Sequence, residues 1–186
     1  MRYSILLPYH DPNYQKTEKF SKLIRSVVRY ATTDDYEFVI VKDGPSYVES
    51  HNRALSNAKG DYFLIFNDDM LSPNFLEETE RALDRGADIA TTFLYLFGNE
   101  RGRHGPEKYP FFTSLFKKSL WETLGGFDPE MLSIGDRDFW YRCLESGAKM
   151  TIVDSTVYFY RKHPDQDSNS VDWEEVNKRF KAKHNL

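Results

Sequence analysis

The sequence predicts an α/β domain built around a mostly parallel central sheet that is flanked by helices. Three short apolar runs, at 3–7, 37–41 and 62–66, are typical of buried strands because they are nearly continuous in apolar residues rather than alternating. Amphipathic segments at about 15–30 and 47–58 separate these runs and predict helices. Strands that alternate with helices in this order pair in parallel through right-handed crossovers.

The rest of the chain predicts a more mixed arrangement. Ser72 followed by Pro73 predicts the N-cap and first residue of a helix that ends near Arg85. The Gly-rich, charged segment 98–108 reads as a mobile surface loop. Further strands are predicted at 87–96, 150–153 and 156–160, an extended aromatic segment at 110–116, and further helices at 120–124, 136–146 and from 172 onward. In the last of these helices, Trp173, Val176 and Phe180 are expected on one face.

Composition narrows the class of protein. The 186 residues fit one domain, 1–186, with a first half at about 1–96 and a second half at about 110–186. A net charge of −4 argues against a general nucleic-acid surface, and Cys143, the single cysteine, excludes an intrachain disulfide. The chain contains no apolar run of membrane-spanning length and no signal-peptide pattern, so we expect a cytoplasmic protein without a membrane span.

Polar loops follow each of the three predicted strands. They contain Pro8-Tyr9-His10, then Asp43, then Asn67-Asp68-Asp69. The carboxyl ends of parallel strands share one edge of a sheet, where ligands bind in open α/β folds. Neither a Gly-x-Gly-x-x-Gly nor a P-loop sequence is present, so a phosphate cradle of those kinds is excluded. Mg²⁺ or Mn²⁺ can bridge such carboxylates to a diphosphate, although an acidic, solvated turn explains Asn67-Asp68-Asp69 equally well on its own.

Six motifs in order resemble those of the GT-A-fold glycosyltransferases of the family 2 type. They cover about residues 3–163, and they are Ser4–His10, Glu37–Gly44, Asn52–Tyr62, Asn67-Asp68-Asp69, Gly125-Gly126-Phe127-Asp128 and Gly135–Arg142. The resemblance implies a metal-dependent, inverting enzyme that moves one sugar from a nucleotide-diphosphate donor of the UDP or GDP type to a hydroxyl of a glycan, glycoconjugate or other acceptor. The nearest alternative is a non-catalytic sugar-nucleotide or glycan-binding module on the same fold, and a nucleotidyltransferase is more distant.

The resemblance also implies roles for individual residues. Asp136 corresponds to the catalytic base, which deprotonates the attacking hydroxyl. Asp69 and His163 correspond to ligands of Mn²⁺ or Mg²⁺, and Asp138 and Trp140 to acceptor contacts. The residues expected near the nucleotide sugar are Pro8, Tyr9, His10, Asp43, Asn52, Asn67 and Asp68.

Several of these residues have simpler structural explanations. Asp43 can be a turn former, and His163 a surface residue that precedes a proline. Asp136 can cap a helix, with Asp138 in its first turn. Three positions depart from the family pattern: Ala54 stands for a glycine, Asn67 replaces an acid of the metal motif, and Gly135 replaces the glutamate that usually precedes the base. These departures motivate the alternative of a non-catalytic module.

Overall fold

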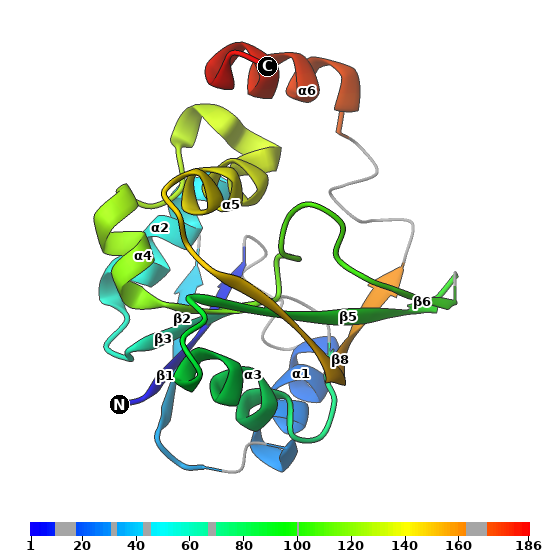
Figure 1. Ribbon diagram of the computed structural model, residues 1–186. Helices are drawn as coiled ribbons and strands as arrows, with labels where there is room; N and C mark the ends of the chain where they lie inside the picture. The colour runs from blue at the N-terminus through cyan, green and yellow to red at the C-terminus, as the bar shows by residue number, and fades with distance from the viewer. Residues whose placement is uncertain (10–17, 31–32, 43–45, 67–69, 100, 163–170) are drawn as a thin grey trace.

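One mixed β-sheet runs through the centre of the molecule (Figure 1). The computed structural model describes residues 1–186 except 10–17, 31–32, 43–45, 67–69, 100 and 163–170. The strand order is β2-β1-β3-β7-β5-β8-β4, and β6 pairs with β5. The strands are β1 (Tyr3–Tyr9), β2 (Tyr36–Lys42), β3 (Tyr62–Ile65), β4 (Met70–Leu71), β5 (Ile89–Gly98), β6 (Gly102–His104), β7 (Leu115–Lys117) and β8 (Met150–Lys162).

The predicted parallel pairing is confirmed where the sequence shows alternating strands and helices. Strand β1 pairs in parallel with both β2 and β3, and β5 pairs in parallel with β8. The remaining pairs, β3 with β7, β5 with β6 and β7, and β4 with β8, are antiparallel. The sheet is therefore α/β in character with short antiparallel insertions, as predicted for the fold class.

Helices cover both faces of this sheet (Figure 1). They are α1 (Glu18–Tyr30), α2 (Tyr47–Asn57), α3 (Phe75–Asp84), α4 (Lys118–Leu124), the 3₁₀ helix η2 (Pro129–Ile134), α5 (Gly135–Glu145) and α6 (Trp173–His184). Alternate residues of β1 point to opposite faces. Ile5 packs in the core with α1 and α3, whereas Leu6 packs in the core with α2 and α5.

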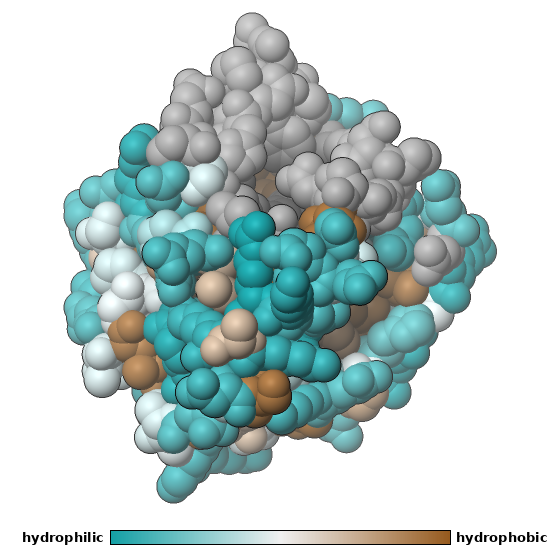
Figure 2. Space-filling model, turned by 90° about the horizontal axis from the view of Figure 1, so that it is seen from above, coloured by the Kyte–Doolittle hydropathy of each residue, from teal (hydrophilic) through white to brown (hydrophobic). Residues whose placement is uncertain are grey.

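The terminal helix α6 lies above η2 and α5 in Figure 1. Phe180 is its buried anchor and packs against Met131 and Ile134 of η2. Asp172 caps the helix by accepting hydrogen bonds from the backbone N–H groups of Glu174 and Glu175. The prediction for Trp173 is wrong, because this side chain is 48% exposed and lies outside the buried face. Figure 2, which views the molecule from above, shows mostly hydrophilic residues over α6.

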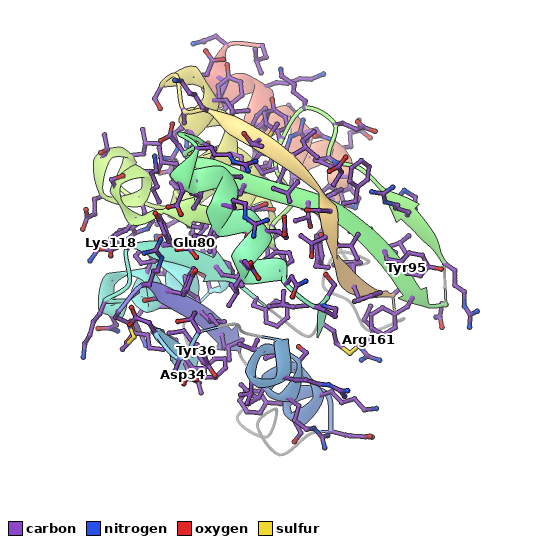
Figure 3. The ribbon with its side chains drawn as sticks, turned by 60° about the horizontal axis from the view of Figure 1, so that its bottom comes forward. Asp34, Tyr36, Glu80, Tyr95, Lys118 and Arg161 are labelled. Atoms are coloured by element: carbon purple, nitrogen blue, oxygen red, sulfur yellow. The ribbon has the colours of Figure 1, made fainter. Side chains whose placement is uncertain are left out.

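Helix α3 is tied to the start of β1 by Glu80, which contacts the Arg2 guanidinium and accepts a hydrogen bond from the Tyr3 hydroxyl (Figure 3). The prediction that Ser72 caps this helix is wrong, because its N-cap is Asn74 in the left-handed conformation. The Ser72 hydroxyl instead lies 2.5 Å from that of Thr156, and it accepts a hydrogen bond from the backbone N–H of Val157.

Two other expectations also need correction. The segment 98–108, predicted as a loop, contains β6, which forms an antiparallel hairpin with β5. The strands predicted at 150–153 and 156–160 are one strand, β8, with a bulge that shifts its register against β5 between Thr92 and Phe93. Short or bulged strands leave a weak sequence pattern, since their pairing is set by distant partners.

Candidate active site

The carboxyl ends of β1, β2 and β3 meet at one edge of the sheet. The parallel register pairs Tyr9 with Lys42 and Leu6 with Ile65, and the backbone N–H of Phe66 donates to the carbonyl of Leu6 at 3.0 Å. The three predicted loops therefore start side by side, as expected. Pro8 and Tyr9 are the last two residues of β1. The other predicted residues of this edge lie outside the described residues: His10, Asp43, Asn67, Asp68, Asp69 and, after β8, His163.

Asp136 lies in the first turn of α5, where it is half-buried. Burial raises the pKa of its carboxyl from 3.8 to about 6, although the backbone N–H groups of Arg137 and Asp136 favour the charged form. Within the described part of the chain, no ion pair reaches this carboxylate. The N-cap of α5 is Ile134, so Asp136 is not the N-cap. A carboxyl with a pKa near 6 at a helix start can accept a proton from a substrate hydroxyl.

Gly135 brings α2 and α5 into close contact beside Asp136. A Cβ atom added at Gly135 would lie 2.7 Å from Cγ2 of Val48 on α2. A glutamate at this position therefore requires Val48 to move. Gly135, which departs from the family pattern, is thus also the residue at which α2 and α5 pack closely in this chain.

Asp138 lies in the same first turn of α5 as Asp136 but differs from it in burial and in the side chains that it contacts. It has no exposed surface, and its carboxylate oxygens lie 2.8 Å from Arg142 Nε, 2.7 Å from Lys183 Nζ and 2.9 Å from His184 Nε2. Arg142 also donates hydrogen bonds to the backbone carbonyls of Leu124 and Gly126. The Asp138 carboxylate therefore joins α5 to α6 and, through Arg142, to the end of α4.

Trp140 is likewise a core residue with 1% of its surface exposed, packed edge-on against Phe116. Asp138 and Trp140 were predicted as acceptor contacts. In this structure both lie inside the helix layer, with no surface for an acceptor to touch. We therefore do not include them in the acceptor site proposed below.

Asn52 of α2 holds the Gly-Gly-Phe-Asp turn. Its Nδ2 donates to the carbonyl of Phe127 at 2.7 Å, and its Oδ1 accepts from the N–H of Phe127 at 2.9 Å. Gly125 caps α4 in the left-handed conformation (φ 74°), and Gly126 has φ 78°. Both polar ends of the Asn52 side chain are thus engaged by backbone, which makes Asn52 a positioning residue for this turn.

Sequence reasoning missed two residues of this region, Lys183 and His184. Lys183 contacts Asp128 at 2.5 Å as well as Asp138, so it joins the Gly-Gly-Phe-Asp motif to α5. The only signal in the sequence is a basic last turn in α6, which also suits the negative end of a helix dipole. Because the helix dipole already explains a basic last turn, the sequence does not indicate that Lys183 and His184 contact Asp138.

Metal ligands are not assembled by the described residues, among which no cluster of three His, Cys, Asp or Glu side chains is close enough to hold an ion. The predicted ligands, Asp69 and His163, carry the carboxylate and imidazole donors that suit Mn²⁺, and carboxylate donors suit Mg²⁺. No helix among those described is long and apolar enough to cross a bilayer.

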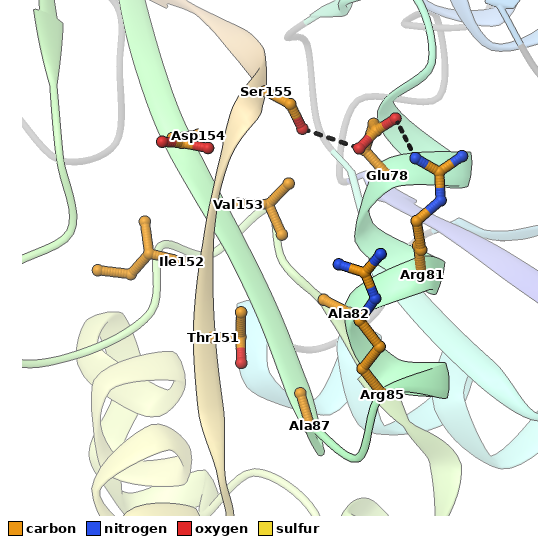
Figure 4. A pocket seen from close by; sticks show the side chains of 10 residues that line it. All are labelled: Glu78, Arg81, Ala82, Arg85, Ala87, Thr151, Ile152, Val153, Asp154 and Ser155. Atoms are coloured by element: carbon orange, nitrogen blue, oxygen red, sulfur yellow. Dashed lines mark hydrogen bonds and ion pairs between the residues drawn. The ribbon is translucent and has the colours of Figure 1, made fainter.

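A separate cavity of about 340 Å³ lies between α3 and the outer edge of β8 (Figure 4). Its residues Ala87 and Thr151 lie at the amino ends of β5 and β8, opposite the edge that carries the predicted site. Glu78 pairs there with Arg81 at 2.8 Å and accepts a hydrogen bond from Ser155 at 2.9 Å. The cavity is thus distinct from the candidate active site.

Comparison with known proteins agrees with this geometry. No family model matches the chain. The uncharacterized glycosyltransferase MJ1057 of Methanocaldococcus jannaschii is 24% identical over an alignment of 196 positions, which covers 80% of this chain and 68% of the relative. The crystal structure of S. aureus TarS 1–349 with UDP-GlcNAc superimposes with a TM-score of 0.79 at 16% identity, covering 98% of this chain. The fold is that of a GT-A glycosyltransferase.

The predicted fold and the predicted resemblance to GT-A glycosyltransferases are thereby confirmed. TarS 1–349 in complex with UDP superimposes with a TM-score of 0.75. The chain spans 66% of the length of TarS 1–349 and 39% of a longer TarS chain, which superimposes with a TM-score of 0.76.

Proposed function

We propose that the chain is an inverting, metal-dependent glycosyltransferase that moves one sugar from a nucleotide-diphosphate donor to an acceptor hydroxyl. The observation that carries the proposal is Asp136: a half-buried carboxyl with a raised pKa of about 6, on a fold shared with TarS, which binds UDP-GlcNAc. The TarS complexes favour a donor of the UDP type.

In this mechanism, Asp136 is the general base. Inversion needs one base on the side of the sugar opposite the leaving diphosphate, where it takes the proton of the attacking hydroxyl. A carboxyl with a pKa near 6 is ionised at neutral pH, and it is more basic than an ordinary aspartate. The backbone N–H groups of Arg137 and of Asp136 itself, in the first turn of α5, stabilise its ionised form.

The loops at the carboxyl ends of the strands bind the donor. Asp69 and His163 are the proposed ligands of Mn²⁺ or Mg²⁺, and the metal, when bound, stabilises negative charge on the leaving diphosphate. The proposed contacts of the nucleotide are Pro8, Tyr9, His10, Asp43, Asn67 and Asp68. Asn52 acts at one remove, by holding Phe127.

The test combines binding and turnover in the same protein. Calorimetric titration with UDP is expected to show tighter binding with Mn²⁺ than with EDTA. Hydrolysis of UDP-GlcNAc, in which water replaces the acceptor, reports turnover. Asp136→Asn is expected to lower turnover about 10²–10⁴-fold with UDP binding retained.

The matched control is Asp154→Asn, an exposed aspartate at the cavity beside α3, which should leave turnover unchanged. Near-full activity of Asp136→Asn would contradict the base role. Tight UDP binding with no turnover on water or on any acceptor would favour the second candidate, a non-catalytic module. Gly135 is the observation that favours that candidate, since it stands in place of the usual glutamate, which would require Val48 to move.

A further inference from the structure

The far half of the sheet carries an uncovered aromatic surface. On the β5 face that packs with α2 and α5, Ile89 and Thr91 are fully buried. From Phe93 onward the same face opens: Phe93 is half-buried and Tyr95 is 39% exposed. The helices therefore cover this face only near the start of β5.

Strand register brings side chains from three strands into one row on this face. Tyr95 of β5 pairs with Arg103 of β6 on one side and with Phe159 of β8 on the other. The Tyr95 and Phe159 rings meet edge to face at 6.1 Å, and the Arg103 guanidinium lies 3.9 Å from the centre of the Phe93 ring. We call Phe93, Tyr95, Phe159 and Arg103 the aromatic face.

The surroundings of the aromatic face are visible from two directions. Figure 2 looks down on the molecule and shows hydrophobic atoms in a hollow beside α6, on the side where Figure 1 draws β5 and β6. Figure 3 places Tyr95 and Arg161 at the same end of the sheet. Arg161 stacks on the Phe97 ring at 4.6 Å, which repeats the pairing of Arg103 with Phe93.

Two arginines point to this face. Arg103 of β6 pairs with Tyr95 and Arg161 of β8 pairs with Phe97, so both share the face of these rings. His104 and Lys162 pair with Leu94 and Gly98 and point to the opposite face. Among the described residues, Arg103 makes no ion pair. A guanidinium held flat on a ring keeps its outer N–H groups free to bind a carboxylate or phosphate in a bidentate manner.

The position of the aromatic face relates it to the proposed reaction. Met70 of β4 pairs with Phe159, and Asp69, the proposed metal ligand, directly precedes Met70 in the chain. A molecule that lies on the aromatic face is therefore next to the strand that leads out of the proposed diphosphate site.

We propose that the aromatic face binds the acceptor, and that this acceptor is an anionic glycan, a sugar chain with carboxylate or phosphate groups. This inference rests on the proposed function and adds the acceptor class to it. The C–H groups of a sugar ring pack on the exposed Tyr95 ring and the half-buried Phe159 ring, which bury apolar area at little entropic cost. Arg103 recognises the acid group through its positive charge and its N–H donors.

The test uses paired probes that differ in charge alone. A hexamer of galacturonate and its methyl ester are compared, together with a set of phosphorylated and unphosphorylated oligosaccharides on an array. The wild type is expected to retain carboxylated or phosphorylated glycans and not their neutral counterparts. Arg103→Gln should weaken that binding about tenfold, the loss typical of one hydrogen bond to a charged group. Tyr95→Ala should also weaken it about tenfold, because it removes the ring on which the sugar packs.

Arg85→Gln is the matched control, because it removes the same charge from an exposed position after α3, at the cavity of Figure 4, and should change nothing. UDP binding should be unaltered in all three variants. UDP binding therefore reports on the donor site, and glycan binding reports on the aromatic face. Equal binding of neutral glycans, or no binding of any anionic glycan, would overturn the proposal. So would binding to phosphatidylglycerol vesicles alone, which would identify a membrane-binding surface instead.

Discussion

Two aspartates in the first turn of α5 show how differently one helix can use the same side chain. Asp138 faces inward, has no exposed surface and meets three basic side chains within 2.9 Å. Asp136 is two residues earlier and therefore about 200° around the helix, where it is half-buried and has a raised pKa of about 6. Burial with cations makes a structural carboxylate, whereas burial without them makes a base.

The strongest test of this difference replaces the paired carboxylate. Asp138→Asn keeps the shape of the side chain but leaves Arg142 and Lys183 without their shared partner. We expect the free energy of unfolding to fall by about 3–5 kcal/mol, the usual cost of breaking a buried ion pair from one side. Urea unfolding measures the loss, with Asp136→Asn as the control that should not lower stability. Equal stability of the two variants would show that the ion pairs of Asp138 contribute little.

A smaller effect is expected at the other end of the same contact. Lys183→Met removes a cation that lies 2.5 Å from Asp128 and 2.7 Å from Asp138, while Arg142 and His184 still hold Asp138. The expected loss is about 1–3 kcal/mol. Lys178→Met changes an exposed lysine on the same helix and should stay within about 0.5 kcal/mol of the wild type. A loss of the same size in both variants would mean that α6 responds to charge in general and not to this contact.

A further effect is a pH dependence that belongs to Asp136. Its folded pKa of about 6 lies above the ordinary value of 3.8, so the folded state binds more protons than the unfolded state between these values. Asp136 therefore lowers stability as pH rises from about 4 to about 6, and Asp136→Asn should gain relative to the wild type over that range. Thermal unfolding at pH 4, 5, 6 and 7 measures the difference. A stability difference that did not change with pH would place the pKa of Asp136 near its ordinary value. Since the base must be ionised, turnover should rise through about pH 6.

The sequence predicted those helices and strands whose apolar pattern lies within the segment itself, and it missed those that are defined by pairing with distant strands. The strands β1, β2 and β3 and the helices between them have strong apolar patterns, and their parallel pairing is confirmed. The two-residue strand β4 and the hairpin strand β6 were missed because pairing with β8 and β5, not composition, defines them. Ser72 has the local sequence of a helix cap, but its hydroxyl is hydrogen-bonded to the hydroxyl of Thr156, 84 positions later.

The sequence by itself determined the order of the elements, the fold class and the choice of Asp136 as the residue to test. These follow from apolar periodicity and from motifs contained within a few residues. Only the tertiary structure decided which aspartate of α5 is paired. The lysine and histidine that contact Asp138 are 45 and 46 positions away, and no local pattern reports a contact at that separation. Burial changes the cost of a charge, and burial exists only after the distant parts of the chain have packed together.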